Sequence, residues 1–166
     1  GGSGFWLTNR DNTIRNNAVA DAEGMGFWLA YPRQTLGLSK AVRMEPQHTE
    51  FGVFDNNVTH SNKMLGFQID NAPINDAGET YDLHYAPLQG GFQFEGAPDA
   101  PFVVSRLVSY KNASALWNRV RRGTFTDFVV ADYHDVGFKG GSQQCLITKA
   151  LVAGTTLNHV NRPGET

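Results

Sequence analysis

The sequence predicts an all-β protein, a right-handed parallel β-helix with about 22 residues in each coil. Strand-like segments recur at a fixed spacing, and the valines Val108, Val130 and Val152 lie 22 residues apart. The segment Phe5-Trp6-Leu7 returns as Phe27-Trp28-Leu29 at the same offset of 22 residues. The composition, with 18 Gly, 11 Phe and 18% charged residues, favours strands and tight turns over amphipathic helices.

Each coil is expected to hold short strands that stack on those of the next coil about 4.8 Å away. Strands of three to five residues are too short to be stable alone, so stacking must provide their hydrogen bonds and their core. The interior column is expected to contain Val19, Val58, Val108, Val130 and Val152. Alanines that flank these valines are expected at the tight corners: Ala18, Ala20, Ala131 and Ala153. A β-sandwich or barrel also has many short strands, but it predicts no fixed 22-residue register.

The middle of the chain is longer than the repeat requires. Val19 and Val58 are 39 residues apart and Val58 and Val108 are 50 apart, which predicts loop insertions at about 31–50 and 72–102. The chain begins with Gly1-Gly2-Ser3-Gly4 and enters a strand-like segment at once. Residues 1–166 are therefore expected to form a single β-helix fragment of a longer protein.

Charge and cysteine content exclude several function classes. The net charge of −2 and the pI near 6.2 provide no basic field for nucleic acid. The single cysteine, Cys145, excludes an internal disulfide framework and is expected to be a small core residue. No apolar run of eighteen residues is present, so no membrane span is predicted. Any contact with a membrane is expected to involve other parts of the polypeptide.

Several segments resemble a known family. Residues 8–20, followed by Gly26-Phe27-Trp28, resemble the β-helix region of the cell-migration-inducing hyaluronan-binding protein, its transmembrane hyaluronidase-like relative and the fibrocystin-like proteins. Residues 54–62, residues 69–71, Tyr110-Lys111-Asn112 and Trp117 continue this resemblance in order, whereas residues 72–102 do not share it. The resemblance implies a secreted or cell-surface β-helix linked to hyaluronan binding or depolymerisation. Fold alone does not define a substrate, so catalysis does not follow from it.

Titratable residues form one candidate catalytic set. Alignment of the coils on their valines places Asp21, His60, Tyr110 and Asp132 in one column, with His134 two positions further on. Carboxylates and imidazoles in such a column could transfer protons to a bound glycan. The candidate catalytic residues are His60, Asp70, Asp132 and His134. Asparagines at the corners, including Asn57, Asn62 and Asn112, are expected to bond the turns and the neighbouring coils.

Aromatic and basic residues form the candidate substrate-binding set. Strand alternation turns Trp6 and Trp28 outward if the neighbouring phenylalanines are inside, unless the first insertion packs over them. The candidate substrate-binding residues are Trp6, Trp28, Tyr110, Lys111 and Trp117. No metal site and no cofactor are expected, because the calcium-loop and zinc-helix motifs are absent; calcium is the cation that Asp70, Asp132 and Asp135 would suit.

The sequence supports two functional hypotheses. In the first, the chain is a secreted or surface module that engages polysaccharide, either by binding it or as part of a glycoside hydrolase or lyase. In the second, the coils form a structural adhesin or assembly scaffold without catalysis, whose insertions contact another copy or the rest of the same polypeptide. Two converging titratable side chains in a groove would favour catalysis.

Overall fold

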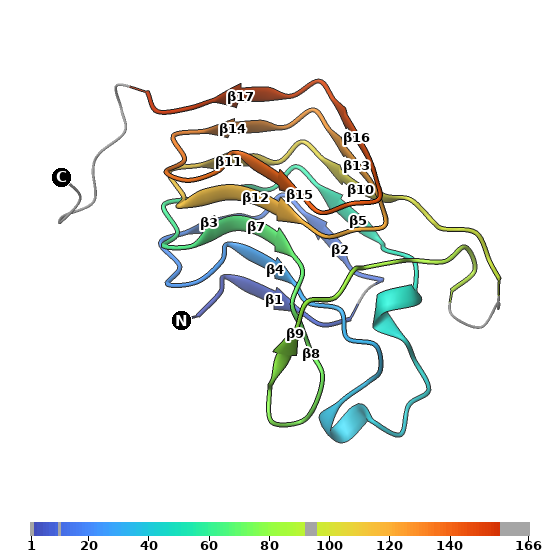
Figure 1. The fold of residues 1–166 in the computed structure, drawn as a ribbon. Helices are drawn as coiled ribbons and strands as arrows, with labels where there is room; N and C mark the ends of the chain where they lie inside the picture. Colours follow the sequence, from blue (N-terminus) through green and yellow to red (C-terminus); the bar gives the residue numbers. More distant parts are fainter. Residues whose placement is uncertain (1, 10, 92–95, 157–166) are drawn as a thin grey trace.

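A computed structural model describes residues 2–9, 11–91 and 96–156, and in these residues the chain winds into a parallel β-helix (Figure 1). Three sheets of five strands run along the stack. Sheet A contains β1 (Phe5–Leu7), β4 (Phe27–Leu29), β7 (Leu65–Ile69), β12 (Ser114–Asn118) and β15 (Phe138–Gly140). Sheet B contains β2 (Thr13–Arg15), β5 (Val53–Asp55), β10 (Phe102–Ser105), β13 (Arg122–Thr126) and β16 (Gln144–Thr148). Sheet C contains β3 (Ala18–Ala20), β6 (Val58–His60), β11 (Val108–Tyr110), β14 (Val129–Ala131) and β17 (Leu151–Ala153).

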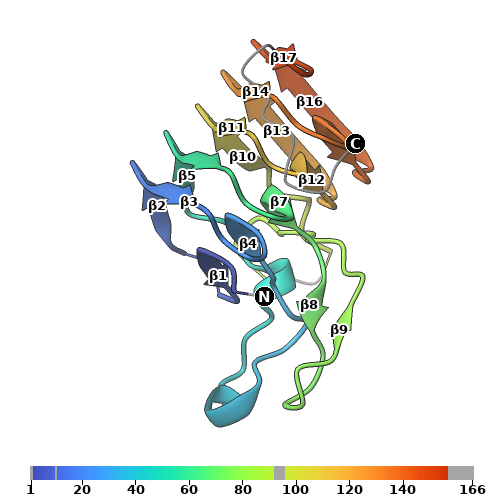
Figure 2. The ribbon, with the colours of Figure 1, turned by 90° about the vertical axis from the view of Figure 1, so that its left-hand side faces the viewer.

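Every coil contributes one strand to each sheet, and each strand pairs in parallel with the same strand of the next coil (Figure 2). The sequence prediction of a parallel β-helix is confirmed. β1 pairs with β4 as Phe5 with Phe27 and Trp6 with Trp28, in the register that the 22-residue offset predicts. Aromatic side chains fill the interior, where Phe27, Phe54 and Phe67 pack edge to face.

The predicted interior valine column is wrong by one residue in two coils. Val19 pairs with Thr59, Thr59 with Ser109, and Ser109 with Val130. Val58 and Val108 therefore lie one position earlier and face outward, only partly buried, whereas Thr59 and Ser109 are fully buried. Valine suits either face of a strand, so the valine pattern by itself does not define which residue points inward.

A ladder of buried asparagines explains the hydroxyl residues in the interior. Asn62 Nδ2 donates to Thr59 Oγ1 at 2.7 Å and to Asn112 Oδ1 at 2.8 Å. Asn112 Nδ2 donates to Ser109 Oγ at 3.0 Å, and its Oδ1 also accepts the Asn62 backbone N–H at 3.0 Å. A buried amide needs such partners, so a valine in place of Thr59 or Ser109 would remove one of them. The structural role predicted for the corner asparagines is confirmed for this pair.

The predicted placement of alanines at the corners is wrong. Ala18, Ala20, Ala131 and Ala153 lie within strands of sheet C. The corner after sheet C is instead formed by residues with left-handed backbone, at φ between 50° and 58°: Asp21, Ser61, Lys111 and Asp132. The corner between sheets B and C has the same conformation at Asn16, Asn56, Arg106, Asp127 and Lys149. Asp and Asn tolerate this conformation better than most residues, which accounts for their frequency in the repeat.

Two segments leave the stack, 30–52 between β4 and β5 and 70–101 between β7 and β10, in the regions where the sequence predicts insertions. The first carries two short 3-10 helices, η1 (Gly37–Ser39) and η2 (Pro46–His48), and the second carries the antiparallel hairpin β8 (Ala72–Pro73) and β9 (Thr80–Tyr81). Both hang from the same end of sheet A (Figure 1). Their bases join the core, because Tyr85 packs against Tyr31 at 4.9 Å and against Phe102 at 5.6 Å between ring centroids.

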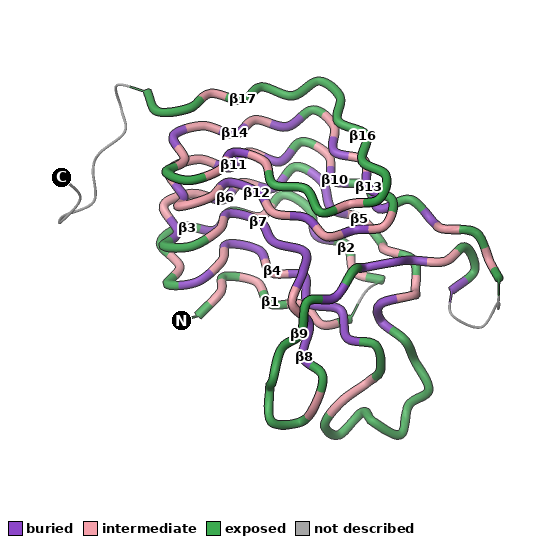
Figure 3. Tube along the Cα trace, viewed as in Figure 1, coloured by how far each residue is buried: buried purple, intermediate pink, exposed green. Residues whose placement is uncertain are grey.

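The last described coil is open to solvent (Figure 3). Ile147 pairs with the buried Phe125, yet its side chain is exposed, and so is that of Val152, which pairs with the buried Val130. Cys145 lies in the same coil and is exposed. The prediction of a buried Cys145 is therefore wrong for the part of the chain that is described, because no further described coil covers this end.

Acid is expected to weaken the fold through Asp55 on sheet B. Arg106 and Ser105 donate hydrogen bonds to this carboxylate, and Arg15 forms an ion pair with it. These contacts, that of Arg106 above all, lower the pKa of Asp55 to about 2. Its contribution to stability is therefore complete above the unfolded pKa of about 4 and is lost as the pH falls through about 2. Urea unfolding at a series of pH values should show a smaller acid-side decline in Asp55→Asn than in the native sequence. Parallel curves for the two proteins would contradict this role.

Candidate functional site

The outer face of sheet A carries one continuous column of large polar and aromatic side chains. In strand order the column contains Trp6, Trp28, Gln68, Trp117 and Lys139. The alternation predicted from sequence holds here, since Phe27 is fully buried while Trp28 on the same strand is half-buried. The Trp6 and Trp28 rings stack with centroids 5.8 Å apart and planes at 24°.

Two of the three tryptophans are held by other residues. The Trp28 indole N–H donates to the backbone oxygen of Asp70 at 2.8 Å, and the Trp117 indole N–H donates to the Asp70 carboxylate at 2.8 Å. The Lys139 ammonium lies 3.8 Å from the Trp117 ring centroid, a cation–π contact that occupies one face of this ring. Trp6, in contrast, is 58% exposed. It is therefore the aromatic surface of this column that is open to a ligand.

Asp70 anchors the second insertion to sheet A. The residue is 4% exposed, and its carboxylate accepts the Leu83 backbone N–H and pairs with Arg119 Nε at 3.3 Å. Arg119 also contacts Asp82 at 2.7 Å, next to Leu83 in the same insertion. These contacts fix the base of the hairpin and the orientation of two tryptophans, which assigns Asp70 a structural task.

Replacement of Asp70 by asparagine is expected to destabilise the protein by about 2 kcal/mol, because it removes the buried one of the two carboxylates that pair with Arg119 and the charged acceptor of the Trp117 indole N–H. Thermal or urea unfolding measures this loss. The surface variant Asp135→Asn, whose carboxylate is exposed, should lose less than about 1 kcal/mol. Equal effects for the two substitutions would show that the Asp70 network contributes little.

A groove of about 600 Å³ lies between Trp6 and the two insertions. Thr8 and Asn9 of the first coil continue the side that Trp6 forms. The first insertion contributes an apolar wall, and the hairpin turn contributes Asn75 and Asp76. An exposed indole beside amide and hydroxyl groups is suited to a sugar, whose ring stacks on the indole while its hydroxyls form hydrogen bonds.

A basic hollow of about 560 Å³ adjoins this groove and shares three lining residues with it, Thr35, Val42 and Met44. The hollow is lined by three cations of the first insertion, Arg33, Lys40 and Arg43, and by one carboxylate, that of Glu45. The protein has a net charge of −2, so this local cluster of cations has the opposite sign to the net charge of the protein. Cations beside an open groove attract an anionic ligand to it.

Tyr110 and His60 lie on a different face. They occupy adjacent coils of sheet C, and their rings stack with centroids 4.7 Å apart and planes at 13°. The predicted column of Asp21, His60, Tyr110 and Asp132 is wrong, because Tyr110 pairs with Ala131 rather than with Asp132. Asp132 is instead at the left-handed corner position that Lys111 occupies in the preceding coil.

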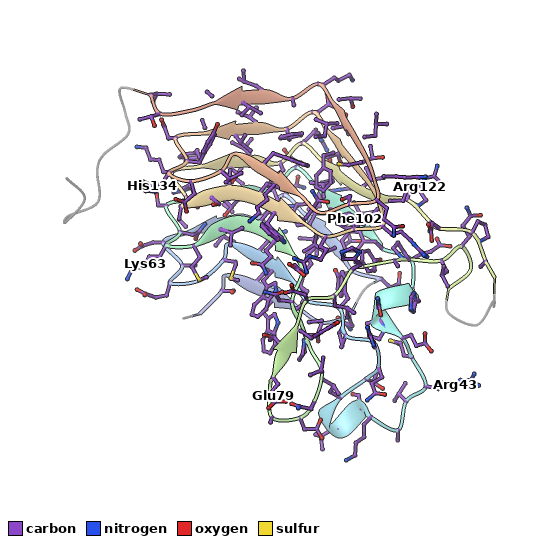
Figure 4. All side chains as sticks on the ribbon, in the orientation of Figure 1. Arg43, Lys63, Glu79, Phe102, Arg122 and His134 are labelled. Atoms are coloured by element: carbon purple, nitrogen blue, oxygen red, sulfur yellow. The ribbon has the colours of Figure 1, made fainter. Side chains whose placement is uncertain are left out.

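The four candidate catalytic residues do not share one groove. Asp132 Oδ1 accepts the Thr156 backbone N–H at 2.7 Å at the corner after sheet C, and His134 Nδ1 lies 2.9 Å from Asp135 Oδ1 on the surface. Figure 4 shows His134 at one side of the stack, far from Arg43 and Glu79 on the insertions. Asp70 directly follows β7, at the end of the strand where the second insertion begins. The corner after sheet C precedes β7, at its other end. Of the nine candidate residues, the structure joins Trp6, Trp28, Trp117 and Asp70 and places His60, Tyr110, Lys111, Asp132 and His134 elsewhere.

Sequence reasoning missed the cations of the first insertion and Asp76 of the second. The available signal was the local charge of the segment 33–43, which holds three of the 14 Lys and Arg residues of the chain. Within the described ranges, no group of three or more His, Cys, Asp or Glu side chains is arranged to hold a metal ion. No helix in the same ranges has the length and apolar character needed to cross a membrane.

Comparison with known proteins identifies the relatives of the chain. Residues 1–67 match the family model of the CEMIP β-helix. The predicted resemblance to this β-helix region is confirmed. The human Cell surface hyaluronidase CEMIP2 is 26% identical across 98% of the chain, and the human Cell migration-inducing and hyaluronan-binding protein is 29% identical across 66%. Human Fibrocystin-L is 29% identical across 81% of the chain. The chain spans 13%, 9% and 3% of these three relatives, so it corresponds to a small part of each.

Proposed function

We propose that this β-helix is a carbohydrate-binding module that holds a polysaccharide segment in the groove between Trp6 and the two insertions. The observation that carries the proposal is the exposed Trp6 ring at a groove with amide and hydroxyl groups. Its stacking on Trp28 fixes the ring before a ligand arrives, which lowers the entropy cost of binding.

The basic hollow favours an acidic polysaccharide. Arg33 and Arg43 carry charges that a uronate carboxylate can pair with when a chain extends beyond the groove. Two relatives are named for hyaluronan or its hydrolysis, which makes hyaluronan the first ligand to test. The name of CEMIP2 includes the cell surface, and a secreted or surface location for this module agrees with such a ligand.

Binding is better supported than cleavage. Glycoside hydrolysis needs two carboxyl groups, or an acid and a base, a few ångströms apart across the sugar. The described lining of the groove includes one carboxylate, that of Asp76 in the hairpin turn. The Asp70 carboxylate is buried in contacts with Arg119 and Trp117. His60, Asp132 and His134 are on other elements.

Titration of the chain with short hyaluronan oligosaccharides, followed by calorimetry and by the indole N–H signals in NMR spectra, tests the proposal. We expect saturable binding that weakens with salt, and a shift of the Trp6 indole signal larger than that of Trp117. Neutral chitin oligosaccharides serve as the control for charge and should bind more weakly. Absence of binding to every saccharide in this set would overturn the proposal and favour the scaffold hypothesis.

A further inference from the structure

The bases of the two insertions are joined by several hydrogen bonds. Gln47 Nε2 donates to the His84 backbone oxygen at 2.7 Å, and the Leu88 backbone N–H donates to the His48 oxygen at 3.0 Å. The buried Tyr85 hydroxyl donates to the Thr49 oxygen at 2.8 Å. The bases of the two insertions are therefore fixed relative to each other.

The tips of the insertions are joined through Asp76. Its Oδ1 accepts the Gly37 backbone N–H at 2.6 Å, and its Oδ2 lies 3.9 Å from Lys40 Nζ. Asp76 and Gly37 both line the groove. A further contact between the insertions, nearer their bases, is that of the Arg33 guanidinium with the Tyr81 ring, at 5.7 Å from its centroid. The side chains of Lys40 and Asp76 are largely exposed, so water competes with this bridge and the bridge can open.

We propose that Asp76 determines which part of a polysaccharide the groove accepts. Since the insertions contact each other at both ends, a ligand between them is surrounded as long as the Asp76 bridge is closed. A chain end or a short oligosaccharide can then enter, whereas an interior segment of a long chain can enter only after the bridge opens. This inference rests on the proposed function, because it concerns the same groove.

The Asp76 bridge affects the rate at which a polysaccharide associates with the groove, and it has less effect on the contacts that the bound sugar makes. Binding of an interior segment is reduced by the fraction of molecules whose bridge is open at a given moment. Short oligosaccharides enter by the open sides of the groove and are not subject to this reduction. Removal of the bridge should therefore accelerate binding of long chains selectively.

The test compares Asp76→Ala with Glu79→Ala on the immobilised full chain. Glu79 is on the same hairpin and its carboxylate accepts a hydrogen bond from Asn75, so this control removes the same charge without touching the first insertion. Surface plasmon resonance with size-fractionated long hyaluronan and with short hyaluronan oligosaccharides measures the rates. We expect Asp76→Ala to accelerate long-chain association by roughly three- to tenfold and to change short-oligosaccharide association by less than about twofold. Glu79→Ala should change neither rate.

The outcomes separate this inference from the proposed function. If the native chain binds neither ligand, the groove itself is not a glycan site and both proposals fail. If the native chain binds both ligands and Asp76→Ala leaves long-chain association unchanged, the bridge proposal fails and the groove remains. Equal changes for long and short ligands would show that Asp76 contacts the sugar directly, which also overturns the bridge. Circular dichroism and the thermal midpoint check that both variants are folded.

Discussion

Replacement of Gly66 by alanine is expected to lower the free energy of unfolding by about 3 kcal/mol, because a methyl group has no room at this position. A Cβ there would lie 2.2 Å from Ser109 Oγ and 2.7 Å from Asn112 Nδ2, which hydrogen-bond each other at 3.0 Å. It would also lie 2.8 Å from the Ala115 backbone oxygen. The substitution must therefore displace both a buried asparagine and the backbone of the next coil. Urea unfolding, followed by circular dichroism, measures the change.

Gly154→Ala is the matched control. A Cβ on Gly154 would meet no atom within 4 Å, and the residue is exposed. Its free energy of unfolding should stay within about 0.5 kcal/mol of that of the native chain. If Gly66→Ala were equally neutral, the asparagine ladder would be able to rearrange and would not define the stacking of the coils.

Replacement of Trp6 by alanine is expected to weaken glycan binding at least tenfold, a loss of about 1.4 kcal/mol or more. Trp6 provides the exposed ring of the groove, and the smaller side chain leaves the sugar without a flat apolar surface. Stability should change little, since Trp6 belongs to the first strand and the residue is 58% exposed. Calorimetric titration with hyaluronan oligosaccharides measures the affinity.

Two further variants make this result specific. Val103→Ala changes an exposed apolar residue of sheet B and should leave binding unaltered. Tyr110→Ala tests the competing location on sheet C, where its ring stacks on His60. A loss of affinity in Tyr110→Ala, with native affinity in Trp6→Ala, would move the binding site from the groove to sheet C.

The register of the first two coils was predictable from the sequence. Between β1 and β4 no insertion interrupts the coil, so the 22-residue offset gives the register of Phe5 on Phe27 and the outward position of both tryptophans. The same reasoning fails at Val58, where a long insertion on either side removes the spacing, and at Val108, which pairs with Val129 at an offset of 21 residues rather than with Val130 at 22. Valine suits either face of a strand, so it does not reveal this shift. The inward residues in these coils are Thr59 and Ser109, whose hydroxyls bond a buried asparagine, and hydrophobic pattern alone does not reveal that preference.

The sequence by itself determined the stacked coils, the outward tryptophans and the location of the insertions, because these follow from local spacing and strand alternation. The groove was decided by the tertiary structure. Lys40 and Asp76 are 36 positions apart and belong to segments without any repeat, so only their joint attachment at one end of sheet A brings their side chains together. Asp70 shows the same principle. The sequence identifies it only as a titratable residue, whereas its contacts with Trp117 and Arg119 make it the anchor of the hairpin. Long-range contacts of this kind depend on how the insertions pack, which no local pattern in the chain encodes.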